Sequence, residues 1–156
     1  PGMALREILT DAFMAMSMRG WAQYNYNADQ PTYLYYMDYV PPAYQIYLFD
    51  DPNLNLPGGP RSTGAYHSGD LAYVFNNVGK TGDFWLEEDF AMARAMSGYW
   101  TNFAKTGNPN GANLPNWARY EPQNHNTQLL SNPIKTIAGA KREKLDLLAQ
   151  RFQTKK

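Results

Sequence analysis

The sequence contains no cysteine among its 156 residues. This absence excludes a disulfide framework, a thiolate zinc site and a thiol nucleophile, and it leaves the redox compartment unreadable. An excess of charge of one sign is also missing, because 14 Lys and Arg residues balance 14 Asp and Glu residues. A chain without a basic excess is not suited to neutralising a phosphate backbone, so we expect no nucleic-acid partner.

Long apolar runs are absent as well. No stretch reaches the roughly 18 apolar residues of a membrane-spanning helix, and the first residues lack the basic and then apolar pattern of a signal peptide. We therefore expect a soluble chain with no membrane partner, and the residues do not separate a secreted from a cytoplasmic location. With 44% apolar residues, the chain is large enough for one compact domain or for one part of a larger domain.

Several patterns that carry chemistry are missing. We find no metal-ligand spacing, no phosphate-binding glycine loop and no dinucleotide fingerprint, so we expect neither a metal nor a cofactor. The pair Gly58 and Gly59, next to prolines, is typical of a turn. None of the five serines lies in the G-x-S-x-G pattern of a nucleophile elbow, in which larger neighbours would clash with the strained turn.

Helical periodicity is present in four stretches. Apolar residues recur at helical spacing, or helix signals flank the segment, at about residues 11–24, 68–77, 85–105 and 139–152. Thr10 or Asp11 could cap the first helix, and we expect its apolar stripe to be buried. The third helix is predicted to be the longest, with Glu87 and Glu88 exposed. Its apolar stripe, expected in the core, contains Phe90, Met96, Trp100 and Phe103.

One strand stands out, at Thr32–Val40. It is β-prone, apolar on both faces and bounded by prolines, which is typical of an interior strand with neighbours on both edges. The long loop that follows, residues 41–64, is rich in Pro and Gly, and short extended pieces are expected at residues 128–137. One confident strand among four helices lacks partners within the chain, so we predict self-association, or pairing with a complementary N-terminal segment, through residues 32–40.

Aromatic residues are abundant, and eight of the twelve tyrosines fall within residues 24–47. These rings could pack in a core, or they could form an exposed stacking platform for sugars or bases. Packing is the interpretation that needs no further assumption.

Only two histidines are present, His67 and His125. His125 lies in a polar loop, where a structural role is the ordinary expectation. His67 follows the loop after the strand, has small residues before it and a predicted helix start after it. This is the place where α/β folds carry catalytic groups. We therefore treat His67 as the candidate catalytic residue.

The segment around His67 reads G-A-Y-H-S-G-D-L-A-Y-V-F. It resembles the G-A-x-H-G-x-E…Y-V-F segment of the type-B carboxylesterases, a family of α/β-hydrolases. Residues 99–111, Y-W-T-N-F-A-K-T-G-N-P-N-G, and residues 114–120, L-P-N-W-A-R-Y, are similar to two further motifs of that family. Several motifs in the same order make the resemblance specific, and it covers nearly the whole chain.

The resemblance implies an α/β fold: residues 1–156 would be the C-terminal segment of an α/β-hydrolase domain, mostly helical with one central strand. His67 holds the position of the triad histidine. Ser68 stands where the family usually has Gly, and Asp70 replaces a Glu that supports the histidine. From the residues alone, Asp70 is better explained as a helix-start charge than as a substitute triad acid.

The function implied is that of a carboxylic-ester hydrolase of the bacterial type, acting on a small-molecule ester without a cofactor. The serine, the acid and the oxyanion hole precede the matched region in this family, so we predict that the chain alone has no serine-esterase activity. Two other hypotheses stay open: a non-catalytic binding or adhesion protein of the same fold, and a free-standing aromatic-rich binding module.

Overall fold

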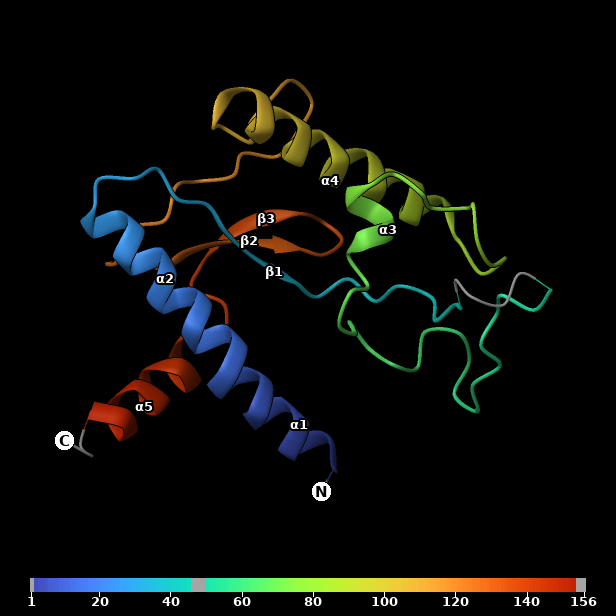
Figure 1. The fold of residues 1–156 in the computed structure, drawn as a ribbon, viewed down its shortest axis with the longest axis horizontal. Helices are drawn as coiled ribbons and strands as arrows, with labels where there is room; N and C mark the ends of the chain where they lie inside the picture. Colours follow the sequence, from blue (N-terminus) through green and yellow to red (C-terminus); the bar gives the residue numbers. More distant parts are fainter. Residues whose placement is uncertain (1, 46–49, 154–156) are drawn as a thin grey trace. The chain divides into compact units, whose positions relative to one another are not determined.

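The computed structural model describes residues 2–45 and 50–153, which form two compact units. The first unit contains residues up to Tyr36 together with Trp117–Leu129 and the segment from Ile134 onward. The second contains Met37–Asn116 and Leu130–Pro133. Figure 1 shows the elements of both units along the chain. None of the helices in the described residues is long and apolar enough to cross a membrane.

The first unit begins with one helical run of three parts. The α-helix α1 (Gly2–Thr10) continues through a π-helical turn, η1 (Asp11–Ala15), into the α-helix α2 (Met16–Asn27) (Figure 1). The prediction of a helix start at Thr10 or Asp11 is therefore wrong. Thr10 has helical backbone angles and its side chain makes no capping hydrogen bond. Asp11 is buried, and its carboxylate binds the Lys141 ammonium at 2.7 Å.

The apolar stripe of this helical run is also not buried as predicted. Phe13 is 72% exposed, Met14 54% and Trp21 64%. The helical spacing was read correctly, but among the described residues no element covers this stripe. A different side of the run contacts the C-terminal helix α5 (Arg142–Gln153). There Asp11 and Ala22 are buried.

Ion pairs hold the helical run to the C-terminal helix. Lys141 approaches Glu7 at 3.6 Å in addition to Asp11, and Lys144 also binds Glu7. Arg19 in α2 pairs with Asp146 in α5 at 2.7 Å. The C-terminal helix starts at residue 142 rather than 139. Leu145, one of its apolar residues, is buried, whereas the side chain of Phe152 lies outside the described residues.

The sheet has three strands in the order β1 (Leu34–Met37), β2 (Asn126–Leu130) and β3 (Lys135–Ala138). Strands β2 and β3 are antiparallel, with Thr127 opposite Ile137, which confirms the extended pieces expected at residues 128–137. The strand predicted at residues 32–40 is shorter, and within the described residues it lies at an edge of the sheet. It stops early because the N–H groups of Asp38 and Tyr39 both reach the same oxygen, Leu130 O, at 3.0 Å.

This edge strand is paired with β2 of the same chain, so one of its sides finds its partner intramolecularly. Such pairing within the chain satisfies part of the backbone that would otherwise attract a second strand. Its side chains are half-buried on average, and Tyr35 is 38% exposed. Cover on both faces, expected for an interior strand, is therefore not observed among the described residues.

In the second unit the dominant element is α4 (Glu87–Thr106), whose 20 residues make it the longest helix described. This confirms the helix predicted at residues 85–105. Gly107 ends it in the left-handed conformation, with φ 71°, as expected for a glycine C-cap. The buried face contains Asp89, Met92, Ala93, Met96 and Tyr99.

Burial along α4 agrees with the prediction only in part. Met96 is fully buried, while Glu87 and Glu88 are exposed as expected. Phe103, predicted to be in the core, is 47% exposed. Phe90 and Trp100 are half-buried. The buried face is rotated toward Met92 and Tyr99 because the short helix α3 (Leu71–Val74) packs against α4, and Tyr99 donates a hydrogen bond to Pro115 O at 2.6 Å.

The loop at residues 41–64 has no helix among its described residues, as predicted, and residues 46–49 lie outside the description. Its two sides meet at one isolated bridge, Tyr44 with Asn53. Ala43 N–H donates to Pro60 O at 2.7 Å. Pro41 and Pro42 are buried. The loop is thus folded back on itself rather than extended.

Candidate active site

His67 lies in the loop that connects the end of β1 to α3, as the sequence predicted. Its side chain is exposed, and it makes no hydrogen bond or ion pair with any residue that the structure describes. The chain reverses here: Gly69 N–H donates to Tyr66 O at 3.0 Å. Histidine can accept a proton on one ring nitrogen while the other is held by a carboxylate. Both ring nitrogens of the exposed His67 imidazole are therefore accessible, one to a proton donor and the other to a carboxylate.

Ser68 adopts a left-handed backbone conformation, with φ 67°. The helix expected from about residue 68 therefore does not begin at Ser68, because a left-handed residue lies outside helical backbone geometry. The short helix after it spans Leu71–Val74 only, rather than continuing to residue 77. Any residue with a Cβ disfavours left-handed backbone angles. This gives a physical reason for the glycine that the type-B carboxylesterase motif usually has at this position.

Gly69 is buried at the tightest point of the same turn. A Cβ placed on it would lie 2.9 Å from Cγ of Pro41 and 3.0 Å from the carbonyl oxygen of Tyr66. Contacts this short require the backbone or the proline to shift. The turn that carries His67 is therefore packed directly against the start of the preceding loop.

Asp70, the second supporting residue expected, is the N-cap of α3. Its side chain makes no capping hydrogen bond, and it is half-buried. His67 has no ion pair with it, since the imidazole binds none of the described residues. The structure therefore does not join Asp70 to His67, and a role as a substitute triad acid gains no support from it.

A buried carboxylate, Asp89, organises the surroundings of this loop, and sequence reasoning missed it. The Asp89 side chain is fully buried and accepts hydrogen bonds from both Nη atoms of the Arg61 guanidinium. The Tyr73 hydroxyl donates to it at 2.7 Å and the Leu86 N–H at 2.6 Å. We call Arg61, Tyr73, Leu86 and Asp89 the Asp89 cluster.

The electrostatics of the Asp89 cluster follow from burial and from these donors. Burial alone would raise the pKa of Asp89, but hydrogen bonds from Arg61, Leu86 N–H and Tyr73 outweigh it and hold the pKa below its ordinary value. Burial, followed by the charge of Asp89, raises the pKa of Tyr39 to about 12. Burial, followed by the hydrogen bond to Asp89, raises the pKa of Tyr73. The carboxylate stays ionised while the phenols stay neutral.

The Asp89 cluster fixes both ends of the His67 loop. Arg61 precedes His67 by six residues and also donates to the carbonyl oxygens of Val40 and Phe84. Tyr73 follows His67 by six residues and is fully buried. In the sequence, the three acidic residues at the start of α4 indicated only a favourable interaction with the helix dipole. They did not indicate that one of them, Asp89, points into the core.

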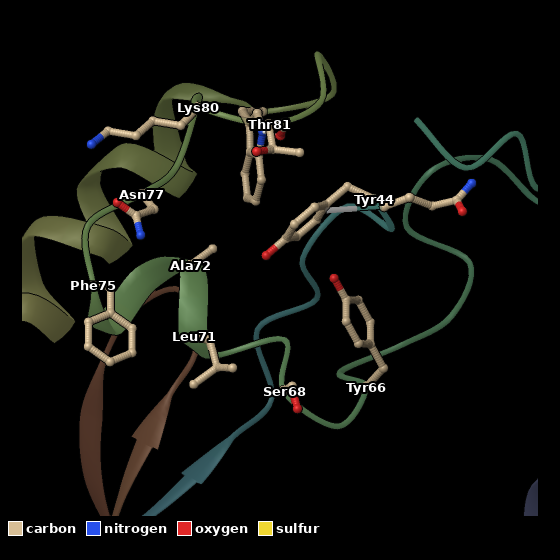
Figure 2. Close-up of a pocket in the computed structure, with 11 residues that line it drawn as sticks. Tyr44, Tyr66, Ser68, Leu71, Ala72, Phe75, Asn77, Lys80 and Thr81 are labelled. Carbon is tan, nitrogen blue, oxygen red and sulfur yellow. Dashed lines mark hydrogen bonds between the residues drawn. The ribbon is translucent and has the colours of Figure 1, made fainter. Parts of the chain in front are cut away.

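A cavity adjoins the same loop. It has a volume of about 670 Å³, and both neighbours of His67, Tyr66 and Ser68, line it (Figure 2). Burial, and then the nearby Tyr44, raise the pKa of Tyr66 to about 12. The Tyr66 hydroxyl donates to Pro42 O at 3.1 Å. The cavity is therefore held by the same loop segments that place His67.

His125 has a structural environment, in the first unit. Its Nδ1 atom lies 2.9 Å from the Tyr120 hydroxyl, and its backbone is left-handed, with φ 50°. Burial, and then the positive charge of Arg19, lower the pKa of His125. These contacts agree with the ordinary expectation for a loop histidine.

The tyrosine-rich segment contributes ring packing. Tyr33 and Tyr35 make edge-to-face contacts with the buried Trp117 at centroid distances of 6.2 and 6.1 Å. Tyr39 packs against Tyr73 in the same manner at 5.7 Å. Tyr24 and Tyr26 are exposed, and Tyr47 lies outside the described residues. Within the described residues no group of His, Asp and Glu side chains could hold a metal ion.

Comparison with known proteins identifies the family of this chain. The family model described as the carboxylesterase family matches residues 2–148. The chain belongs to the carboxylesterase family, of the type-B kind that its motifs resemble.

Individual relatives agree with this assignment. Carboxylesterase 4A of Bos taurus is 32% identical over 123 residues, which is 79% of this chain and 20% of the relative. Bile salt-activated lipase of Rattus norvegicus is 41% identical over 83 residues, or 51% of this chain and 13% of the relative. The chain thus spans about a fifth or less of the length of these relatives.

Solved structures show the fold. A carboxylesterase of Geobacillus stearothermophilus matches with a TM-score of 0.64 at 23% identity, over 93% of this chain and 30% of its own. A thermophilic PNB esterase matches with a TM-score of 0.57 at 25% identity, over 76% of this chain and 22% of its own. Both are α/β-hydrolase esterases, and the described helices and small sheet form part of that fold.

Proposed function

We propose that this chain supplies the general-base histidine, His67, and part of the substrate pocket of a carboxylic-ester hydrolase. The observation that carries the proposal is the family match over residues 2–148, within which His67 occupies the motif position of the triad histidine. The exposed imidazole, on a turn held from both sides by the Asp89 cluster, is in keeping with that role. Ester hydrolysis by the whole protein is part of the proposal.

In the proposed reaction, His67 accepts the proton of a serine hydroxyl as that oxygen attacks the ester carbonyl carbon. The protonated ring then gives the proton to the departing alkoxide, and the same exchange with water releases the acid. A carboxylate would hold the other ring nitrogen. The sequence has no G-x-S-x-G segment, so the serine must come from polypeptide outside these 156 residues.

The experiment uses the reading frame that continues upstream of residue 1, expressed as one polypeptide. We expect it to encode a G-x-S-x-G segment and to hydrolyse an activated aryl ester. His67→Ala should lower kcat by at least about 10³-fold without changing the melting temperature. The matched control is His125→Asn. His125 is the other histidine of the sequence and lies in the first unit, so this variant should keep the turnover of the wild type.

Two outcomes would contradict the proposal. Near-normal turnover in His67→Ala would show that His67 is not the general base. An upstream sequence without a nucleophilic serine, together with no hydrolysis, would favour the non-catalytic binding protein of the same fold.

A further inference from the structure

One side of the helical run α1–η1–α2 carries large apolar side chains that solvent reaches. Eight such residues are between 39% and 76% exposed, and none of the eight is charged. We call them the exposed stripe: Leu5, Ile8, Leu9, Phe13, Met14, Met18, Trp21 and Tyr24. Single exposed apolar residues are normal on a protein surface, but a continuous row of this size marks an interaction surface.

The π-helical turn η1 keeps the exposed stripe on one side of the run. An α-helix turns by about 100° per residue, so residues on one side recur three or four apart. Leu5 and Leu9 have this spacing, and so do Met14 and Met18. Leu9 and Met14 are five apart, which suits the i→i+5 hydrogen bonding of the π-turn between them. If η1 were an ordinary α-helical turn, the α2 half of the stripe would be rotated by about 100° from the α1 half.

Ion pairs on the opposite side of the run hold it against α5, which lies beside it in Figure 1. Asp11, buried inside η1, binds Lys141 at 2.7 Å, and Lys141 also approaches Glu7 in α1 at 3.6 Å. Beyond η1, Arg19 binds Asp146 at 2.7 Å. A buried carboxylate such as Asp11 is tolerated only with its partner. These contacts therefore fix both halves of the run with the exposed stripe facing away from α5.

The size of the related proteins indicates what covers the exposed stripe. The part matched by this chain is 20% of carboxylesterase 4A and 13% of bile salt-activated lipase, so most of each relative lies outside it. The proposed function already requires such polypeptide for the nucleophilic serine, which precedes the matched region in the family that the motifs resemble. The helical run is the first element described and begins at Gly2. A polypeptide joined to residue 1 would therefore be tethered directly beside the stripe.

Two other occupants fit less well. A second copy would have to compete with a tethered segment, whose effective concentration is about millimolar for a short connection. A helix that lies on a lipid surface carries Lys and Arg on its polar side, whereas the polar side of this run presents the acidic Glu7 and Asp11. An uncharged apolar face of the preceding polypeptide is therefore the occupant that these observations favour.

We propose that the exposed stripe is the surface on which the polypeptide preceding residue 1 docks, and that η1 sets the rotation at which both halves of the stripe reach it. The proposal rests on the proposed function for the existence of that polypeptide. The docked face is apolar and uncharged, to match the stripe. The ion pair between Asp11 and Lys141 holds the π-turn from the other side.

Thiol labelling tests whether the stripe is covered. The sequence has no cysteine, so Met14→Cys places a single reporter in the middle of the stripe of the 156-residue chain. We expect N-ethylmaleimide to label this position at least about tenfold more slowly in the longer polypeptide, because a docked surface reacts only when it opens. Peptide mass spectrometry reads position 14 separately from any cysteine of the added part. Glu87→Cys, whose native side chain is 83% exposed, is the matched control and should react alike in both polypeptides.

A charge placed in the stripe tests which residues make the contact. Trp21→Asp should restore rapid labelling of Met14→Cys in the longer polypeptide, because an unpaired carboxylate is costly to bury. Leu147→Asp is the matched control, since Leu147 in α5 is 60% exposed and Trp21 is 64% exposed, and it should leave the protection intact. Both positions are exposed, so circular dichroism of the 156-residue chain should show folded variants.

Deletion of Ala12 tests the rotation. Removing one residue from η1 closes the π-turn into an α-helical turn and rotates α2 by about 100° relative to α1. In the longer polypeptide, Leu9→Cys and Met18→Cys should each be protected, and after the deletion at least one of them should label rapidly. Circular dichroism checks the helix content of the deletion variant. If that variant does not fold, the Trp21→Asp comparison still decides whether the stripe is the docking surface.

Three results would overturn the inference: equal labelling of position 14 in the two polypeptides, protection that survives Trp21→Asp, and protection of both Leu9→Cys and Met18→Cys in a folded deletion variant. Protection of the 156-residue chain that grows with its concentration would assign the stripe to a second copy instead, and protection that needs added phosphatidylcholine vesicles would assign it to lipid. None of these results depends on hydrolysis. A protected stripe in a polypeptide that keeps normal turnover in His67→Ala would contradict the proposed function alone.

Discussion

The hydroxyl of Tyr73 donates a hydrogen bond to Oδ1 of Asp89 over 2.7 Å, and both side chains are fully buried. Arg61 and the Leu86 N–H satisfy the remaining positions of the same carboxylate. A buried charge is tolerated only when it is paired and hydrogen-bonded in this way. The hydrogen bond between Tyr73 and Asp89 links α3 to the start of α4. It therefore secures the C-terminal side of the loop that carries His67.

Replacing Asp89 should destabilise the second unit strongly. Asp89→Asn leaves the Arg61 guanidinium without its counter-charge and removes the carboxylate that accepts the Leu86 N–H, so we expect a loss of about 3 kcal/mol in the free energy of unfolding. Urea denaturation measures this loss. Glu88→Gln, the exposed neighbour, is the matched control and should stay within about 0.5 kcal/mol. Equal effects of the two changes would contradict a special role for Asp89.

The ionised Asp89 carboxylate should also make the free energy of unfolding depend on pH. The pKa of Asp89 is lower in the folded chain than its ordinary value of 3.8, so its contribution to stability is present above about pH 4 and is lost as the pH falls through the folded pKa. The difference in unfolding free energy between the wild type and Asp89→Asn should therefore shrink at acidic pH. A difference that stays constant down to pH 2 would show that Asp89 does not act through its charge.

The sequence predicted the elements of the fold better than their burial. Helical spacing located α4 and α5 within a few residues, because periodicity is a local property of the chain. Exposure of Trp21 and Phe103 could not be predicted, because the periodicity of a stripe does not say whether another element covers it. The same holds for the strand at residues 32–40, whose composition suggested an interior position although it lies at the edge of the described sheet.

For the candidate site, sequence identified His67 and its turn but not what holds them. Asp89 and Arg61 are 28 residues apart, and nothing in their spacing indicates that they meet. The departure of Ser68 from the resembling motif was visible in the sequence. Its meaning, a left-handed backbone angle, needed the structure.

Ser68→Gly should stabilise the second unit. At φ 67° a residue with a Cβ is strained by about 1–2 kcal/mol, whereas glycine costs about 0.5–1 kcal/mol through its freedom in the unfolded chain. We expect a net gain of about 0.5 kcal/mol in the free energy of unfolding, measured by urea denaturation. Ser68→Ala keeps the Cβ while removing the hydroxyl, so it should show no gain. A gain in Ser68→Ala as well would locate the effect in the hydroxyl instead.

Replacing Gly69 and Gly20 by alanine should change the stability of the chain in opposite directions. In Gly69→Ala the new Cβ meets Pro41 Cγ at 2.9 Å and Tyr66 O at 3.0 Å, so we expect a loss of about 2 kcal/mol. Gly20 lies inside α2, and a Cβ there meets nothing within 4 Å. Gly20→Ala should therefore gain about 0.5–1 kcal/mol from helix propensity. Melting temperatures of both variants give the two signs, and a stable Gly69→Ala would contradict the close packing of the His67 turn.

The last prediction concerns His125 and the acid side of stability. Burial, and then the charge of Arg19, lower its folded pKa below the ordinary value of 6.5, against an opposing effect of Asp146 and with a smaller contribution from Arg142 in the same direction as Arg19. Between the folded pKa and about pH 6.5 the unfolded chain therefore binds the proton more readily, so stability should rise with pH up to about 6.5 and then level off for this group.

His125→Asn removes this titration while suiting the left-handed backbone angle at that position, since Asn tolerates it. We expect the stability advantage of the wild type over His125→Asn to fall as the pH is lowered from 7 to 5, as measured by urea denaturation at each pH. The ring signals of His125 in an NMR titration should give a midpoint below 6.5. An advantage that grows on acidification, or a midpoint above 6.5, would show that Asp146 rather than burial and Arg19 dominates the site.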